Sequence, residues 1–170
     1  SEDEILRLWQ GLGYYSRARN MMQTAQQIMH DFQGKFPTKF ESLKKLKGVG
    51  DYTAAAIASF AFKEVVPVVD GNVYRFLARL LGIETDISSS QAKAEFTKIA
   101  SALISTEEPD VFNRAIMEFG ALQCVPVNPD CSVCPFQTTC HAYRYSEIRV
   151  LTVTHLLAFA KKSYYANLEH

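Results

Sequence analysis

Apolar side chains recur at intervals of three and four residues along most of the chain, which is the spacing of one face of an α-helix. Gly and Pro residues separate these stretches. The one short alternating stretch, residues 65–69, contains Pro67, which argues against a central strand. We therefore predict an all-α fold, with helices over residues 5–9, 16–32, 38–46, 51–62, 70–80, 88–103 and 111–122.

Two of these helices carry more specific expectations. The helix over 16–32 starts at Ser16, a residue type that commonly caps helix N-termini. The helix over 51–62 is almost wholly apolar (TAAAIASFAF), so we expect it to be buried on most sides.

Length and composition are those of an ordinary globular protein. The 170 residues suffice for one moderate domain or two small helical lobes. The formal net charge is zero, so any contact with nucleic acid must come from a local patch and not from bulk charge. No apolar run is long enough to span a membrane and no secretory signal is evident. We expect a cytoplasmic monomer.

All four cysteines fall within one short segment, in the pattern Cys-x6-Cys-x2-Cys-x5-Cys. Structural disulfides are usually dispersed, so this clustering indicates a metal site in a reducing compartment. Zinc sites commonly use two short Cys-x2–4-Cys pairs, whereas only one is present here. The spacing therefore favours an iron–sulfur cluster over zinc, and both over unligated thiols. The ligands would be Cys124, Cys131, Cys134 and Cys140.

A glycine-containing turn, Lys47-Gly48-Val49-Gly50, joins two of the predicted helices. It directs the N-terminus of the second helix outward, where unpaired N–H groups and the helix dipole favour an anion such as a phosphate. Lys44, Lys45 and Lys47 would add sequence-independent attraction. On the glycines alone, a plain helix–helix turn with a solvated lysine face is the simpler interpretation.

Asp70 opens the predicted helix over 70–80, within the sequence Val-Val-Asp-Gly-Asn-Val. The simplest interpretation is an N-cap that accepts a hydrogen bond from the N–H of Asn72 or Val73. A carboxylate held at a helix N-terminus is also the group that an oxocarbenium-like transition state requires nearby. The two roles are compatible.

The segment Gly-Leu-Gly-Tyr-Tyr-Ser-Arg-Ala-Arg joins the first two predicted helices. An exposed aromatic on a turn flanked by glycines can wedge into a base stack, and arginines nearby can contact phosphates. The candidates are Tyr14, Arg17 and Arg19, although paired tyrosines more often pack in a core or at its rim.

The chain resembles the helix-hairpin-helix DNA glycosylases of the endonuclease III superfamily. The resemblance rests on the cysteine spacing, the Gly-Val-Gly hairpin, the Val-Val-Asp-Gly-Asn-Val segment and the Gly-Leu-Gly-Tyr-Tyr loop. The loop makes the chain most similar to adenine glycosylases of the MutY kind, over about residues 2–144. The resemblance implies base-excision repair of double-stranded DNA, with removal of adenine mispaired with 8-oxoguanine or guanine. It also implies a [4Fe–4S] cluster on the four cysteines.

The resemblance further implies roles for single residues. Asp70 would be the catalytic carboxylate that stabilises, or transiently bonds, the sugar C1′. The hairpin residues Gly48, Val49 and Gly50 with Lys47 would bind the DNA backbone, Tyr14 would intercalate, and Leu12 would contact the lesion side. Bifunctional relatives carry a lysine at the position of Tyr52; a phenol cannot form an imine, so we expect a monofunctional glycosylase.

Two features of the family have no match in this sequence. Members carry a glutamate general acid upstream of the probing loop, and Glu2 and Glu4 lie too close to that loop to be its equivalent. Members also continue into a C-terminal domain that recognises 8-oxoguanine. We therefore expect this chain to be impaired or inactive in turnover. Alternatives are a non-catalytic DNA-binding iron–sulfur module and an endonuclease III-like glycosylase and lyase.

The chain is expected to consist of five segments. We also expect a bacterial protein that associates with the nucleoid when bound to DNA. The expected segments are a helix end and DNA-probing loop (1–20), a helical core (21–122) with the helix-hairpin-helix at about 38–62, the cluster loop (123–144), a tail of unknown role (145–167) and a tag remnant (168–170).

Overall fold

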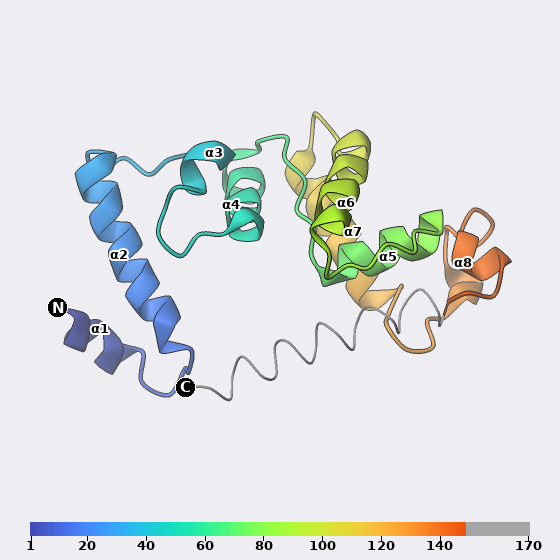
Figure 1. Cartoon of the computed structure of the whole chain (residues 1–170), viewed down its shortest axis with the longest axis horizontal. Coiled ribbons are helices and arrows are strands. Elements are labelled where there is room, and N and C mark those ends of the chain that lie inside the picture. The colour runs from blue at the N-terminus through green and yellow to red at the C-terminus, as the bar shows by residue number, and fades with distance from the viewer. Residues whose placement is uncertain (149–170) are drawn as a thin grey trace. The chain divides into compact units, whose positions relative to one another are not determined.

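The computed structural model describes residues 1–148, and every regular element among them is a helix, which confirms the predicted all-α class. The expected tag remnant and most of the tail, residues 149–170, lie outside the described residues. The other segment boundaries stay predictions. The helices are α1 (Glu2–Leu8), α2 (Tyr15–Asp31), α3 (Phe40–Leu43), α4 (Asp51–Phe62), α5 (Gly71–Leu81), α6 (Ser90–Leu103), α7 (Pro109–Leu122), the 3₁₀ turn η1 (Cys131–Val133) and α8 (His141–Arg144) (Figure 1).

The chain forms two compact units, Ser1–Val66 and Pro67–His170. We refer to them as the N-terminal unit, which holds α1 to α4, and the C-terminal unit, which holds α5 to α8. Within the described residues, no helix combines the length and apolar character needed to cross a membrane.

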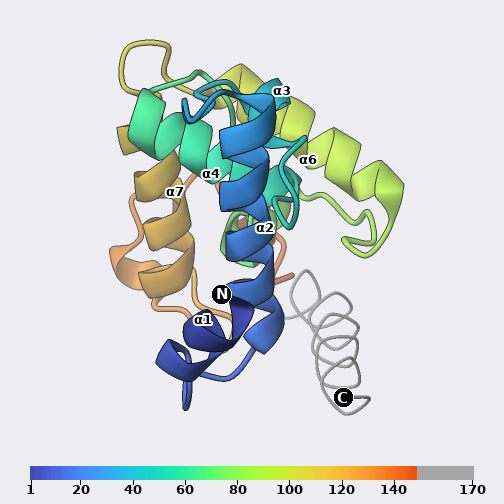
Figure 2. The same cartoon turned by 90° about the vertical axis from the view of Figure 1, so that its left-hand side faces the viewer.

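The N-terminal unit has a small core. Its fully buried members are Leu43 and Leu46 from the α3 region and Ala54 and Ala58 from α4. The middle of α4 is buried as predicted, but both of its ends are exposed, so burial on most sides holds only for the central turns. Earlier in this unit, α1 packs against α2 (Figure 2).

The predicted cap of α2 is wrong. Tyr14, not Ser16, is the N-cap, and it makes no side-chain hydrogen bond to the first turn. Gly13 and Tyr14 both have positive φ, +67° and +47°, and this left-handed turn places the N-cap two residues earlier than predicted. Ser16 therefore lies inside the first helical turn.

The helix predicted over 38–46 is shorter, because α3 covers only Phe40–Leu43. The chain then continues in tight turns, with the N–H groups of Lys45 and Leu46 donating to the carbonyls three residues earlier. These turns lead directly into the glycine hairpin.

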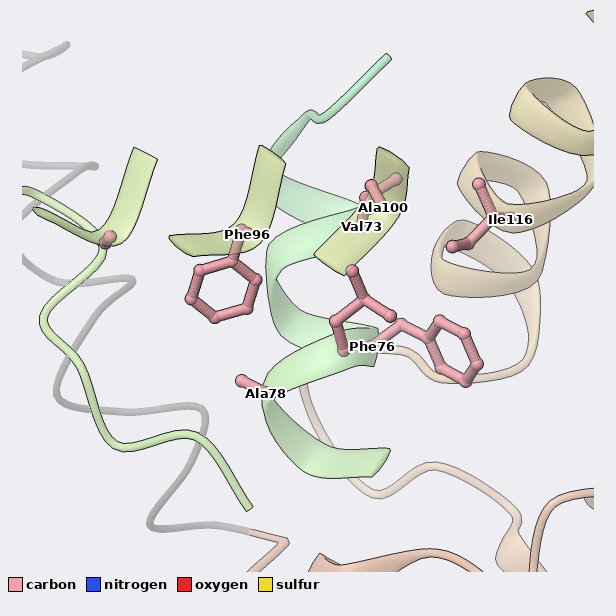
Figure 3. Close-up of a cluster of buried hydrophobic side chains, with 8 residues drawn as sticks. Val73, Phe76, Ala78, Phe96, Ala100 and Ile116 are labelled. Atoms are coloured by element: carbon pink, nitrogen blue, oxygen red, sulfur yellow. The ribbon is translucent and has the colours of Figure 1, made fainter. Parts of the chain in front are cut away.

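The C-terminal unit has a larger core, built around α5. Side chains from α5, α6 and α7 meet there (Figure 3), among them Val73, Phe76, Phe96 and Ile116. Phe76 also packs edge-on against Phe119, with ring centroids 4.8 Å apart. The start of α5 is therefore fixed by packing along most of the helix that follows it.

Candidate functional site

Asp70 caps α5, as predicted. Its Oδ1 accepts hydrogen bonds from the backbone N–H groups of Asn72 and Val73, both at 2.9 Å. Its Oδ2 accepts one from the side-chain amide of Asn72 at 3.0 Å. Both carboxylate oxygens are thus held in place at the positive end of the α5 dipole. The residue is half-buried, so the carboxylate is fixed but not sealed off.

Asn72 and Arg75 extend this site, and sequence reasoning missed both. The Arg75 guanidinium donates to Asn72 Oδ1 at 2.9 Å, to the carbonyl of Cys124 at 2.8 Å and to the carbonyl of Gly120. The side chain is buried, and burial lowers the pKa of Arg75 from its ordinary value. A continuous series of hydrogen bonds therefore runs from Asp70 through Asn72 and Arg75 to the backbone at Cys124.

Gly120 on α7 allows this arrangement. A Cβ atom at this position would lie 2.7 Å from the carbonyl oxygen of Asn72, a distance at which something must shift. The missing side chain lets α7 approach the first turn of α5, which places the Gly120 carbonyl within reach of Arg75. No local sequence signal distinguishes this glycine from an ordinary helix residue.

The four cysteines line one pocket beside the aromatic side chains of Phe76, Phe119 and Phe136. Arg79 is 1 % exposed and holds the loop that carries the first cysteine. Its guanidinium donates to Cys124 Sγ at 3.3 Å, to the Val125 carbonyl at 2.8 Å and to the Pro126 carbonyl at 2.9 Å.

The chemistry of this pocket suits a polynuclear cluster. Burial, and then the neighbouring Cys134 thiol, raise the pKa of Cys131, and burial likewise raises the pKa of Cys134. A cationic centre would favour the thiolates that this crowding otherwise disfavours. No three His, Cys, Asp or Glu side chains among residues 1–148 are close enough to hold one metal ion. The four thiols around this pocket are soft sulfur ligands, the kind that iron–sulfur clusters and zinc both use.

The hairpin between α3 and α4 depends on Gly48. Its φ is +74°, and a Cβ there would meet Asn20 Cβ at 2.5 Å, so only glycine fits without distortion. Gly50, the N-cap of α4, has φ −84° and open space where its Cβ would lie. Val49 packs against the small core and donates its N–H to the Leu46 carbonyl at 3.2 Å.

The residues beside the hairpin differ in their availability. Lys44 Nζ is 3.0 Å from Asp51 Oδ1, and this hydrogen bond and charge raise the pKa of Lys44. Lys44 is therefore engaged with the protein, whereas Lys45 and Lys47 are exposed. Tyr52, the second residue of α4, is 48 % exposed.

The loop predicted to probe DNA is held by Trp9, whose indole N–H donates to the Gly13 carbonyl at 3.0 Å. Leu12 and Tyr14 are exposed. The Arg17 guanidinium lies 4.8 Å from the centroid of the Tyr14 ring, so these two predicted DNA contacts lie together. Arg19 instead pairs with Glu2, with Nε 2.9 Å from Oε1.

Glu2 and Glu4 both take part in local interactions of α1. Glu2 holds Arg19, and Glu4 completes a capping box with Ser1. The structure thus gives each of them a role at the start of the chain that is unrelated to Asp70.

Comparison with known proteins gives consistent results. Residues 1–102 match the family described as HhH-GPD superfamily base excision DNA repair protein. The chain is 45 % identical to an adenine DNA glycosylase of Arabidopsis thaliana, over 89 % of this chain and 24 % of that protein. It is 43 % identical to the adenine DNA glycosylase of Homo sapiens, over 84 % of this chain and 26 % of that protein. The chain thus spans about a quarter of the length of these curated relatives.

Solved structures share the fold. A thermostable thymine-DNA glycosylase aligns with a TM-score of 0.77 at 28 % identity, covering 85 % of this chain and 67 % of that one. A non-covalent endonuclease III–DNA complex aligns with a TM-score of 0.71 at 26 % identity, covering 86 % and 67 %. The family match covers more than half of the chain, and the helical architecture agrees with it. The chain therefore belongs to the HhH-GPD superfamily of base excision DNA repair proteins.

Proposed function

We propose that this chain is part of a monofunctional DNA glycosylase that removes adenine mispaired with 8-oxoguanine or guanine from double-stranded DNA. The observation that carries the proposal is the geometry of Asp70, whose two carboxylate oxygens are both fixed at the N-terminus of α5. The curated relatives named adenine DNA glycosylase support the choice of adenine as the base.

The chemistry follows from the charge of the transition state. Breaking the bond between the sugar C1′ and adenine leaves positive charge on the sugar, and a fixed carboxylate beside C1′ stabilises that charge. Water then adds its oxygen to C1′, and its proton leaves. Adenine must be protonated to depart, and we assign this step to neither Glu2 nor Glu4, because each is held at the start of α1.

The absence of an amine at position 52 limits the reaction to base removal. Strand cleavage by a lyase requires an imine between a lysine and the opened sugar. Tyr52 supplies a phenol at that place on α4, which supports the monofunctional reaction and disfavours the endonuclease III-like alternative.

Contact with DNA would come from two places in the N-terminal unit. Adenine must leave the base stack for its sugar to reach a carboxylate, and Tyr14 on its left-handed turn is suited to fill the gap. The backbone at Gly48 and Gly50 would bind a phosphate, with Lys47 adding attraction. Action as a monomer on the DNA of a bacterial nucleoid is part of the same proposal.

Cys124, Cys131, Cys134 and Cys140 would hold a [4Fe–4S] cluster. When bound, such a cluster would cross-link the four thiolates and stabilise the cysteine loop. Independently of it, Arg79 holds the carbonyls of Val125 and Pro126, and Arg75 connects Cys124 to Asn72. Through Arg75, the cysteine loop therefore helps to hold Asn72, which donates a hydrogen bond to Asp70.

Adenine release under single-turnover conditions tests the proposal. We expect slow release from duplexes with adenine opposite 8-oxoguanine or guanine, and none from adenine opposite thymine. Asp70→Asn should abolish it, whereas Asp3→Asn, on the exposed first turn of α1, should not. Tight DNA binding without any release would instead favour the non-catalytic module. Equal release by the wild type and Asp70→Asn would contradict the role of Asp70.

Borohydride treatment with abasic DNA tests the monofunctional reaction separately. We expect no stable covalent adduct, because Tyr52 cannot form an imine that borohydride would reduce. An adduct formed in high yield would support the glycosylase and lyase alternative.

A further inference from the structure

One face of α2 holds the backbone of the glycine hairpin. The Thr24 hydroxyl donates to the Lys47 carbonyl at 2.6 Å. The Gln27 side chain bridges two backbone groups, since its amide donates to the Lys45 carbonyl at 3.0 Å and its oxygen accepts from the Lys47 N–H at 2.9 Å. Figure 1 shows the loop between α3 and α4 beside α2.

A third residue of α2 completes this face. Asn20, Thr24 and Gln27 are spaced by four and three residues, which places them in one row along the helix. The Asn20 side chain occupies the space beside Gly48, where a Cβ would lie 2.5 Å from Asn20 Cβ. The row therefore contacts the hairpin continuously from Lys45 to Gly48.

These contacts fix a turn that would otherwise have many conformations. Gly48 has φ +74°, and a glycine populates positive and negative φ values about equally well. The Val49 N–H is used within the turn, while those of Gly48 and Gly50 have no hydrogen-bond partner in the described part of the chain. Backbone N–H groups bind an anion tightly only if they are already directed at the same point in the free protein. If they must be ordered on binding, the lost conformational entropy lowers the affinity.

A purely structural role explains the contacts less well. The apolar attachment of the hairpin comes from Leu43, Leu46 and Val49, which pack in the small core. The hydrogen bonds from Thr24 and Gln27 lie at exposed positions, where water competes and the contribution to global stability is small. Their specific effect is on the conformation of residues 45–48.

We propose that Thr24 and Gln27 are positioning residues that hold the hairpin so that the N–H groups of Gly48 and Gly50 meet one DNA phosphate. This inference rests on the proposed binding of DNA through the hairpin. It adds that the affinity of a backbone site depends on two side chains of another helix that do not touch the DNA.

The test is duplex DNA binding as a function of salt, from about 50 to 200 mM. Thr24→Val and Gln27→Met remove the hydrogen bonds with little change in shape. We expect the double variant to bind about tenfold more weakly and its salt slope to fall by about one, as for the loss of one phosphate contact. Helix content and the melting temperature should change little.

Matched controls separate this role from general damage. Gln26→Met, next to Gln27 but on an exposed face, should leave affinity and slope unchanged. Thr24→Ser keeps the hydroxyl and should restore most of the affinity that Thr24→Val loses. If the double variant fails to fold, the single variant Thr24→Val and its serine counterpart still decide the question.

A second measurement is independent of affinity. On addition of duplex DNA, the amide N–H signals of Gly48 and Gly50 should shift more than that of Gly34, which lies in a different turn. The shifts should shrink in the double variant.

The outcomes distinguish the two proposals. If the wild type binds DNA and the double variant binds with the same affinity and slope, the inference about Thr24 and Gln27 is wrong while the proposed function stands. Equal weakening by Gln26→Met, or failure of Thr24→Ser to restore binding, would also overturn it. If the wild type binds no DNA, the proposed function fails and this inference fails with it.

Discussion

The two units hold their candidate functional groups by different means. In the C-terminal unit, the Asp70 carboxylate is part of a hydrogen-bond series through buried Arg75, on a helix packed along most of its length. In the N-terminal unit, the hairpin is held by a left-handed glycine and by exposed hydrogen bonds from α2. The carboxylate is thus rigidly placed, whereas the conformation of hairpin residues 45–48 depends on contacts that water can replace.

This difference has an energetic consequence. A buried polar group that loses its partner cannot turn to water, so its loss destabilises the whole unit. An exposed hydrogen bond that is lost is replaced by one to water, and the main effect is on local conformation. Substitutions in the C-terminal unit should therefore reduce stability, and those at the hairpin should reduce DNA binding.

The largest effect is expected for the cysteines. Cys134→Ala removes one of the proposed cluster ligands, and we expect bound iron and acid-labile sulfide to be lost together. The free energy of unfolding should fall by more than about 4 kcal/mol, the range in which loss of a metal site lies. Metal and sulfide analysis with urea unfolding measures both. Stoichiometric zinc without sulfide in the wild type would contradict the cluster.

Arg79→Met comes next. The change removes a buried guanidinium and its part-buried hydrogen bonds to the carbonyls of Val125 and Pro126, which should cost about 2–4 kcal/mol of unfolding free energy. Arg7→Met, on the exposed surface of α1, is the matched control and should change it by less than about 0.5 kcal/mol. If chemical denaturation gave equal losses of unfolding free energy for the two substitutions, the special role of buried Arg79 in the C-terminal unit would be contradicted.

Gly120→Ala tests the C-terminal unit at its closest approach. The added Cβ would lie 2.7 Å from the Asn72 carbonyl oxygen, and overpacking against backbone costs about 1–3 kcal/mol. Because Asn72 holds Asp70, adenine release should fall more steeply than stability. Unchanged release with reduced stability would show that the position of Asn72 does not matter for the reaction.

In the hairpin, Gly50 gives the opposite pattern, with an effect on DNA binding but not on stability. Gly50→Ala meets no atom within 4 Å and has φ −84°, so stability should change by less than about 0.5 kcal/mol, because the lower entropy of the unfolded chain offsets the weaker N-cap of alanine. DNA affinity should nevertheless fall, because the methyl group would project where a phosphate approaches. Gly48→Ala, at φ +74°, should lose both affinity and about 2 kcal/mol of stability. Thermal melts and binding titrations on both variants separate the two effects.

The smallest effect concerns the Lys44–Asp51 pair. The pKa of Lys44 is raised above its ordinary value of 10.5, chiefly by the hydrogen bond to Asp51. The pair therefore contributes fully from neutral pH up to about pH 10.5, and this contribution is lost as the pH rises through the raised pKa of Lys44. Comparing the wild type with Asp51→Asn, we expect a small stability difference at neutral pH that disappears in strong alkali. A difference that grows with pH would contradict the pairing.

Local signals in the sequence predicted the helix starts well where the cap is local. Gly50 precedes α4, which begins at Asp51, and the Asp70 side chain caps the first turn of α5. Both signals act on the residues directly after them, so the sequence alone locates these helix starts. The prediction of a Ser16 cap was wrong, because the N-cap of α2 is Tyr14, whose left-handed conformation the residue type does not indicate.

The contacts that fix the site could not be predicted in this way. Arg75 reaches carbonyl groups 45 and 49 positions further along the chain, and Gln27 reaches the hairpin across 18 and 20 positions. Such pairs depend on how helices pack, which no spacing pattern within one helix records. The residue types at the site were therefore predictable, whereas the residues that position them were not.

The most direct test of the central claim uses two abasic analogues in otherwise identical duplexes. A pyrrolidine analogue carries a positive charge near C1′, and a tetrahydrofuran analogue of the same shape carries none, so only the first resembles the charged transition state. The claim that Asp70 stabilises that charge predicts at least about tenfold tighter binding of the cationic analogue, equivalent to about 1.4 kcal/mol, and loss of this preference in Asp70→Asn. Equal binding of the two analogues by the wild type would contradict it.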